Sequence, residues 1–177
     1  MPSFSSLSRL NPDDTRPAFD CGDRDLNEFY TVDSTESDKQ LLSVTYLALD
    51  DEGEGVAFLS LSNDSIKKED VPRSAFERVV RSVSRMKRYK SMPAVKLGRL
   101  ATRGDVQGMG IGTSVLDFLK VWFTNGNKTG CKFILVDAYN NARAIKFYKD
   151  NGFKFLIGSD EKEPTRLMYF DLITFRP

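Results

Sequence analysis

The stretch Gln107-Gly108-Met109-Gly110-Ile111-Gly112-Thr113 decides the fold, because this glycine-rich loop lies between two strongly patterned segments. Before it, residues 94–101 (AVKLGRLA) have the composition of a strand. After it, apolar residues recur at helical spacing: Ile111, Val115, Phe118, Leu119 and Trp122. The sequence therefore predicts a strand, a loop and an amphipathic helix in direct succession.

A second strand follows this helix. Residues 132–139 contain the run Phe-Ile-Leu-Val, which is typical of a strand buried on both faces. A strand–helix–strand crossover implies two parallel strands with a right-handed connection. A short helix over Asn141–Asn151 comes next, with Asn141 as its N-cap and Gly152 as its stop.

The flanking segments predict antiparallel strands and further helices. The expected elements are an edge strand at residues 4–10, a helix around residues 26–30, strands 41–49 and 56–61 with a hairpin at 50–55, a charged helix over 66–88, and final strands 153–157 and 166–175. The predicted fold class is mixed α/β (α+β), as one domain over residues 1–177. Its sheet is mostly antiparallel, with a central parallel crossover and helices on both faces.

Composition excludes several classes of chemistry. The chain has 177 residues with 26 Lys and Arg, 25 Asp and Glu and no histidine. Without histidine, Ser-His-Asp and Cys-His nucleophile systems and the usual zinc sites cannot be built, so we expect no metal. Cys21 and Cys131 have no metal-binding spacing and are expected to be reduced thiols, with a disulfide or a reactive thiol as the alternatives. Neither a membrane span nor a secretory signal is recognisable, so we expect a cytoplasmic protein.

The composition of the glycine-rich loop is suited to an anion-binding site. Glycines let successive backbone N–H groups converge, and the following helix adds its unpaired first-turn amides and the positive end of its dipole. Amides of Met109, Ile111 and Thr113 are available for this role, and the natural ligand is a phosphate or diphosphate. A Walker A loop would need a lysine after Gly112, and a Rossmann fingerprint needs GxGxxG, so neither fits.

The pattern Gln-x-x-Gly-x-Gly, formed by Gln107, Gly110 and Gly112, resembles the acyl-CoA pyrophosphate loop of the GNAT superfamily of N-acetyltransferases. The context agrees: Leu97–Thr102 (LGRLAT) looks like that family's fourth strand. Residues 141–153 look like its second cofactor element, N-x-x-A-x-x-F-Y-x-x-x-G-F. The resemblance extends from about residue 41 to residue 175.

This resemblance implies acetyl-CoA as the cofactor and assigns roles to individual residues. The loop Gln107–Thr113, which also includes Gly108, would bind the diphosphate, and the backbone of Leu100, Ala101 and Thr102 would run beside the pantetheine arm. Tyr148 would protonate the departing thiolate, with a packed aromatic core residue as the alternative. Asn141 would bond the pantetheine, cap its helix, or do both.

A finer resemblance starts near the N-terminus. Phe19-Asp20-Cys21-Gly22, followed by Leu26, Asn27 and Phe29, looks like the F-x-C-G-x-x-x-L-x-x-F/W opening of one GNAT branch. That branch contains toxins of type II toxin–antitoxin modules, which acetylate the α-amine of aminoacyl-tRNA and are held by an antitoxin. Residues 88–94 (RYKSMPA) resemble the same branch. The implied partners are tRNA and a ribbon-helix-helix antitoxin, and a homodimer is compatible with this interpretation.

The basic segment, residues 67–90, carries nine Lys and Arg against three acids. It is either a polyanion-binding face for tRNA or an ordinary solvated helix face. We expect acetyl transfer to a primary amine by direct attack, with no assigned base; Glu28 and Asp137 are acids without a predicted role. The alternatives are a protein amine or a small metabolite as acceptor, a non-catalytic acyl-CoA-binding module, and a protein-interaction component.

Overall fold

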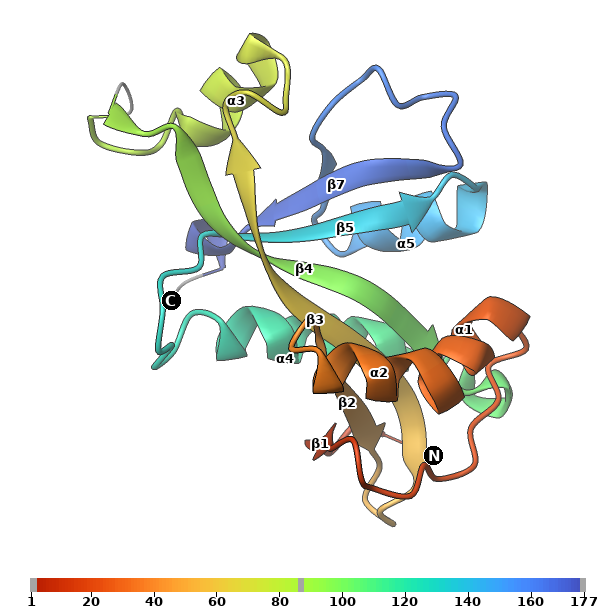
Figure 1. Cartoon of the computed structure of the whole chain (residues 1–177). Helices are drawn as coiled ribbons and strands as arrows, with labels where there is room; N and C mark the ends of the chain where they lie inside the picture. Colours follow the sequence, from red (N-terminus) through yellow and green to blue (C-terminus); the bar gives the residue numbers. More distant parts are fainter. Residues whose placement is uncertain (1–2, 86–87, 176–177) are drawn as a thin grey trace. The chain divides into compact units, whose positions relative to one another are not determined.

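The computed structural model describes residues 3–85 and 88–175, and within these ranges seven strands form one sheet in the order β1-β2-β3-β4-β5-β7-β6 (Figure 1). The strands are β1 (Ser6–Leu10), β2 (Val44–Leu49), β3 (Gly55–Lys67), β4 (Ser91–Thr102), β5 (Phe133–Tyr139), β6 (Lys154–Phe155) and β7 (Thr165–Asp171). β4 and β5 are parallel, whereas β1–β2, β2–β3, β5–β7 and β6–β7 are antiparallel. This confirms the mixed sheet and its central crossover.

The helices are α1 (Arg24–Glu28), α2 (Ser34–Lys39), α3 (Arg73–Val80), α4 (Ile111–Trp122) and α5 (Ala142–Asp150). A π-helical turn, Phe29–Asp33, joins α1 to α2, and short 3-10 turns cover Gly104–Val106 and Leu172–Thr174. Helix α4 is the crossover from β4 to β5, as predicted. Of the described helices, none combines the length and the apolar character that crossing a membrane requires.

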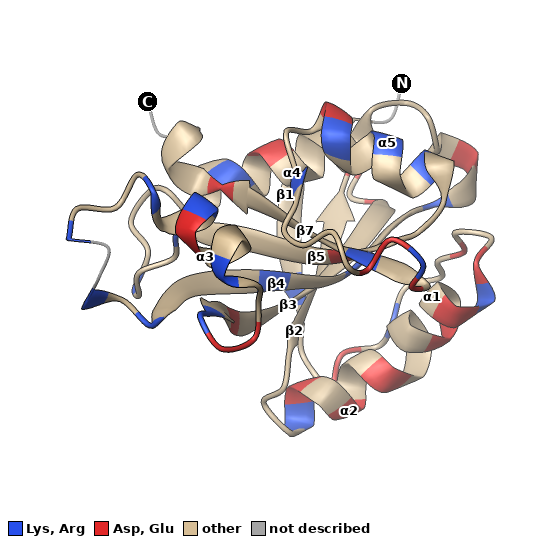
Figure 2. Ribbon diagram, turned by 90° about the horizontal axis from the view of Figure 1, so that it is seen from above, with Lys and Arg blue, Asp and Glu red and all other residues tan. Residues whose placement is uncertain are grey.

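The chain divides into two compact units, and the predicted single domain stays a prediction. The first unit is Met1–Ser62 with Leu97–Leu119, and the second is Asn63–Lys96 with Lys120–Pro177. In the first unit, Phe58 packs with Phe29 and Tyr30 on one face of the sheet. Leu59, which points to the other face, is equally buried. Figures 1 and 2 show α1 and α2 on one face of this unit and α4 on the other.

The second unit also has two packed faces. Phe133 and Leu135 of β5 lie in a cluster with Phe76 and Val79 of α3. The alternate β5 residues, Ile134 among them, are buried on the side of α5. Helices thus cover both faces of the sheet within each unit, as the sequence predicted.

The prediction of a helix over residues 66–88 is largely wrong. Ile66 belongs to β3, and α3 contains only the eight residues Arg73–Val80. Pro72, which is poorly accommodated in a helix interior, marks the start of α3 as its N-cap residue. At the other end, Arg85 has a left-handed backbone (φ 57°), which no α-helix can continue through.

Several strand limits also differ from the prediction. β2 begins at Val44 because Leu41, at φ 59°, terminates α2, with the Leu42 N–H bonded to Ser37 O. β4 begins at Ser91 and includes Pro93, whose carbonyl accepts the Lys132 N–H. At the C-terminal side, β6 has only two residues and β7 ends at Asp171, where a 3-10 turn begins.

The buried face of α4 is rotated from the predicted one. Ile111, Val115 and Leu119 are buried as expected, but Leu116 is buried as well. Phe118 and Trp122 are 37% and 36% exposed. At about 100° per residue, the buried arc therefore centres between Val115 and Leu116 rather than between Val115 and Phe118. Phe118 instead meets Phe4 edge-on, with 5.3 Å between ring centroids.

Candidate functional site

The glycine-rich loop, Gln107–Thr113, lies in the first unit between the 3-10 turn and α4. Gly108 and Gly110 have φ values of 79° and 87°, in the region that other residues rarely adopt. A Cβ atom at either glycine would meet no described atom within 4 Å, so the loop faces open space. Met109 between them is 54% exposed, and its N–H turns back to Val106 O at 3.4 Å. The Met109 amide thus forms one long turn hydrogen bond, and its role toward a ligand stays a prediction.

Helix α4 begins directly after Gly110. The Ser114 N–H donates to Gly110 O at 3.0 Å, in the first turn of the helix. The amides of Ile111 and Gly112 also belong to this first turn, where a helix leaves its N–H groups without helical acceptors. Two positive-φ glycines in open space followed by a helix N-terminus fit a diphosphate, which needs close backbone approach and several N–H donors.

Gln107 is predicted to bind the cofactor, which stays a prediction; its side chain donates hydrogen bonds to two backbone carbonyls. Its Nε2 donates to Cys21 O at 2.8 Å and to Thr102 O at 3.1 Å. The side chain therefore joins the loop to the end of β4 and to the F-x-C-G segment. Cys21 itself is a buried free thiol, and Cys131 is also free. Burial raises the pKa of both thiols, so both stay protonated at neutral pH.

Leu100, Ala101 and Thr102 form the end of β4, and their predicted place beside the pantetheine arm stays a prediction. Ala101 is buried in the cluster that contains Phe58 and Tyr30. Leu100 and Thr102 are half-buried. These positions lie in the first unit with the glycine-rich loop.

Asn141 lies in the second unit and caps α5. Its side chain accepts the Ala144 N–H at 2.9 Å, and its own N–H donates to Tyr139 O. The capping role is thus confirmed, while a pantetheine contact stays a prediction. The preceding Asn140 has a different task, because its side-chain amide donates to two carbonyls of the loop that precedes β7, those of Glu161 and Glu163.

Tyr148 is the buried residue of α5, with 9% exposure, whereas Phe147 is half-buried. Its ring contacts Phe147 and Phe153 edge-on, with centroids 5.1 and 5.3 Å apart. Among the described residues, none forms a hydrogen bond with its hydroxyl. Burial raises the pKa of Tyr148, which keeps the phenol in its proton-donating form.

Neither acid without a predicted role stands out as a base. Asp137 on β5 forms an ion pair with Lys96 on β4, with 2.5 Å between Oδ2 and Nζ. This agrees with the expectation that its carboxylate is engaged locally. Glu28 is exposed at the end of α1.

In Figure 2 the ribbon of α1 and α2 is coloured largely for acidic residues (red), and the ribbon around α3 and the turns that follow it has several basic positions (blue). Within the basic segment, several cations already have protein partners. Arg73 pairs with Glu77 at 2.6 Å, and Lys67 approaches Asp70. Arg81, Arg85 and Arg88 are exposed. Lys87, also named in our prediction, lies outside the described residues.

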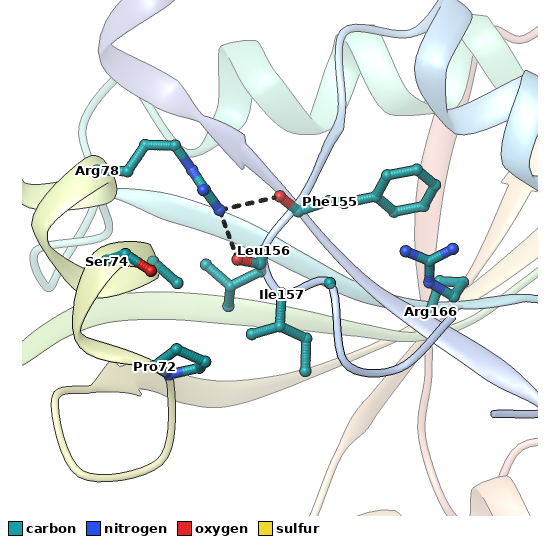
Figure 3. Close-up of a pocket in the computed structure, with 9 residues that line it drawn as sticks. Pro72, Ser74, Arg78, Phe155, Leu156, Ile157 and Arg166 are labelled. Carbon is teal, nitrogen blue, oxygen red and sulfur yellow. Dashed lines mark hydrogen bonds between the residues drawn. The ribbon is translucent and has the colours of Figure 1, made fainter. Parts of the chain in front are cut away.

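Arg78 is also exposed, but its guanidinium is bonded to backbone carbonyls. Its guanidinium donates to Leu156 O at 2.6 Å and also reaches Phe155 O (Figure 3). It borders a cavity of about 280 Å³ that Arg166 also lines. Arg166 is held by Asp160 at 2.8 Å and stacks on the Phe155 ring. None of the predicted site residues lines this cavity.

The family comparison agrees with this geometry. A model described as an acetyltransferase (GNAT) domain matches residues 43–155. Among solved structures, AtaT complexed with acetyl-methionyl-tRNAfMet is 26% identical, with a TM-score of 0.71 and 96% of each chain covered. A complex described as AtaTR bound with AcCoA is 22% identical, with a TM-score of 0.70 over 96% of this chain and 94% of that one.

A tyrosine-to-phenylalanine mutant of KacT is also 22% identical, with a TM-score of 0.72, and the alignment covers 96% of this chain and 95% of that one. Likenesses at 22% identity establish the fold. The family model covers well over half of the chain and includes the glycine-rich loop and Tyr148. The chain belongs to the GNAT family of acetyltransferases.

Proposed function

We propose that this protein transfers the acetyl group of acetyl-CoA to the α-amine of aminoacyl-tRNA. The main support for this proposal is the structure of the glycine-rich loop, whose two positive-φ glycines open onto free space in front of the α4 N-terminus. Acetyl-CoA supplies an acyl thioester that is already activated. The residues of the chain then have to bind, orient and donate a proton.

Membership of the GNAT family supports one role for each group. The first-turn amides of α4 bind the diphosphate, and backbone N–H groups near the end of β4 stabilise negative charge on the reacting carbonyl oxygen. The hydroxyl of Tyr148 donates a proton to the departing sulfur. A buried phenol with a raised pKa is present as the neutral donor throughout the physiological range.

Aminoacyl-tRNA is favoured as the acceptor for three reasons. The chain has no histidine, and Asp137 is paired, so a weakly basic amine that needs no dedicated base suits this site. Arg81, Arg85 and Arg88 offer exposed positive charge for a polyanion. AtaT, the 26% identical relative, has been solved with acetyl-methionyl-tRNAfMet. AtaT has also been solved with the C-terminus of the antitoxin AtaR, and we extend an antitoxin partner to this chain.

The test compares acetyl transfer from acetyl-CoA to charged tRNA with transfer to a panel of free amines. We expect charged tRNA to be the preferred acceptor. Tyr148→Phe should lower kcat by about 100-fold or more while leaving the Kd for acetyl-CoA unchanged. Tyr169→Phe is the matched control, because Tyr169 is a buried tyrosine of the same unit. Transfer to a free amine alone would overturn the acceptor, and unchanged turnover in Tyr148→Phe would overturn the proton donor.

A further inference from the structure

We infer that Gln107 is a positioning residue that sets the glycine-rich loop through hydrogen bonds to the N-terminal turn, Asp20–Asp23, and that Asn27 fixes this turn. The inference rests on the proposed acetyl-CoA site. It gives the F-x-C-G segment a task in that site, although no side chain of the turn needs to touch the cofactor.

Two donors, one just before the loop and one on its first residue, bind two consecutive carbonyls of the N-terminal turn. The Gly104 N–H donates to Asp20 O at 2.8 Å. Gln107 Nε2 donates to Cys21 O at 2.8 Å and reaches Thr102 O at 3.1 Å. The side chain of Gln107 thus joins three points: the turn, the end of β4 and the first residue of the loop.

Asn27 on α1 holds the opposite side of the same turn. Its Oδ1 accepts the Cys21 N–H at 3.0 Å and the Cys21 thiol at 3.1 Å. Its Nδ2 donates to Asp20 Oδ1 at 2.7 Å, and the same oxygen accepts the Gly22 N–H. With the donors of the turn engaged by Asn27 and Asp20, its carbonyls are presented to Gln107 and Gly104.

The charge states of the groups support this network. The Gly22 N–H and the Asn27 amide lower the pKa of Asp20, so its carboxylate is an acceptor at neutral pH. Burial raises the pKa of Cys21, so its thiol keeps the proton that it donates to Asn27. Every member of the network therefore holds the protonation state that its bonds require.

The loop needs such a support because of its own sequence. Gly108 and Gly110 give it the conformations that an anion site requires, but glycine also has the largest conformational freedom to lose. Fixing Gln107, the residue immediately before Gly108, lowers the cost of ordering the loop around a ligand. Loss of the support should therefore weaken acetyl-CoA binding without changing the chemical step.

A double-mutant cycle on acetyl-CoA binding tests the inference. Gln107→Met and Asn27→Leu each remove the bonds at similar side-chain volume. Each should raise the Kd and the KM for acetyl-CoA about five-fold, with kcat close to the wild-type value. If Gln107 acts through the turn, the double variant should bind about as well as the weaker single variant, because one network is broken twice. Effects that multiply to about 25-fold would mean that Gln107 acts on the cofactor by itself, and would overturn the inference.

Tyr30→Phe is the matched control for general destabilisation of this unit. It removes the buried bond from the Tyr30 hydroxyl to Pro17 O at 3.1 Å, outside the network. Its melting temperature should fall while acetyl-CoA affinity stays at the wild-type value. An equal loss of affinity in Tyr30→Phe, or unchanged affinity in Gln107→Met, would overturn the inference. If the wild-type protein failed to bind acetyl-CoA, the proposed function would fail first, so the two failures are distinguishable.

Discussion

The glycine-rich loop and the basic segment differ in which part of the chain carries their chemistry. The loop acts through its backbone. Gly108 and Gly110 therefore mark, already in the sequence, where the chain has positive φ and leaves room for a ligand. The basic segment acts through long side chains, and the count of arginines does not reveal which of them are already bonded. Arg78 is directed at Leu156 O, and Arg73 at Glu77. A backbone site can thus be predicted from sequence more securely than a charged surface.

The largest effect is expected from a substitution in the glycine-rich loop that weakens acetyl-CoA binding. Gly110→Asp places a side chain at φ 87°, which costs about 1–2 kcal/mol, and adds a negative charge where an anion should bind. Together these should weaken acetyl-CoA binding roughly 100-fold, as measured by titration calorimetry. Gly126→Asp is the control, because Gly126 also has positive φ (68°) and open space but lies beyond α4. A similar loss in both variants would show that strain alone, and not an anion site, explains the result.

The second effect concerns the exposed arginines. Replacing Arg81, Arg85 and Arg88 together by Glu should reduce affinity for charged tRNA about ten-fold or more and leave acetyl-CoA binding unchanged. If each contacts one phosphate, the slope of log K against log[salt] should flatten by roughly two. The same charge change at exposed Lys39, Lys128 and Lys162 should have a much smaller effect. Equal losses of tRNA affinity in the two triple variants would mean that the basic segment is an ordinary solvated surface.

The sequence predicted the parts of the fold that depend on local patterning. The crossover, the cap at Asn141 and the stop at Gly152 all follow from periodicity and turn chemistry, and the structure confirms them. The prediction of a helix over residues 66–88 is wrong because Pro72 is the N-cap residue of α3, so the charged pattern before it does not belong to a helix. In the site, Asn27 was noted for its place in a motif. Its bonds to Cys21 and Asp20 follow from tertiary packing, which no spacing rule expresses.

A smaller effect is expected at Arg78, which differs from Arg81, Arg85 and Arg88 in its bonds to backbone carbonyls. Arg78→Leu removes the bonds to the carbonyls of Phe155 and Leu156 and should lower the free energy of unfolding by about 1 kcal/mol. In a protein of this size, that corresponds to a drop in melting temperature of about 2–4 °C. Arg73→Leu breaks only an exposed i,i+4 pair with Glu77 and should cost about 0.3–0.5 kcal/mol. Affinity for tRNA should be unchanged in Arg78→Leu. A large loss of tRNA affinity would mean that Arg78 is part of the polyanion-binding surface.

The smallest effect is expected in the pH dependence of kcat, which should not change at alkaline pH. An ordinary tyrosine has a pKa near 10, and burial raises that of Tyr148 further. A group whose proton is required is active below its pKa, so the phenol should stay a competent donor as the pH rises from 7 to 10. We therefore expect kcat with a saturating amine to show no decline from Tyr148 in this range, after subtraction of enzyme-free acetyl-CoA hydrolysis. A decline centred near pH 9 that disappears in Tyr148→Phe would mean that this phenol titrates within the range, which burial alone in a packed aromatic cluster would not allow.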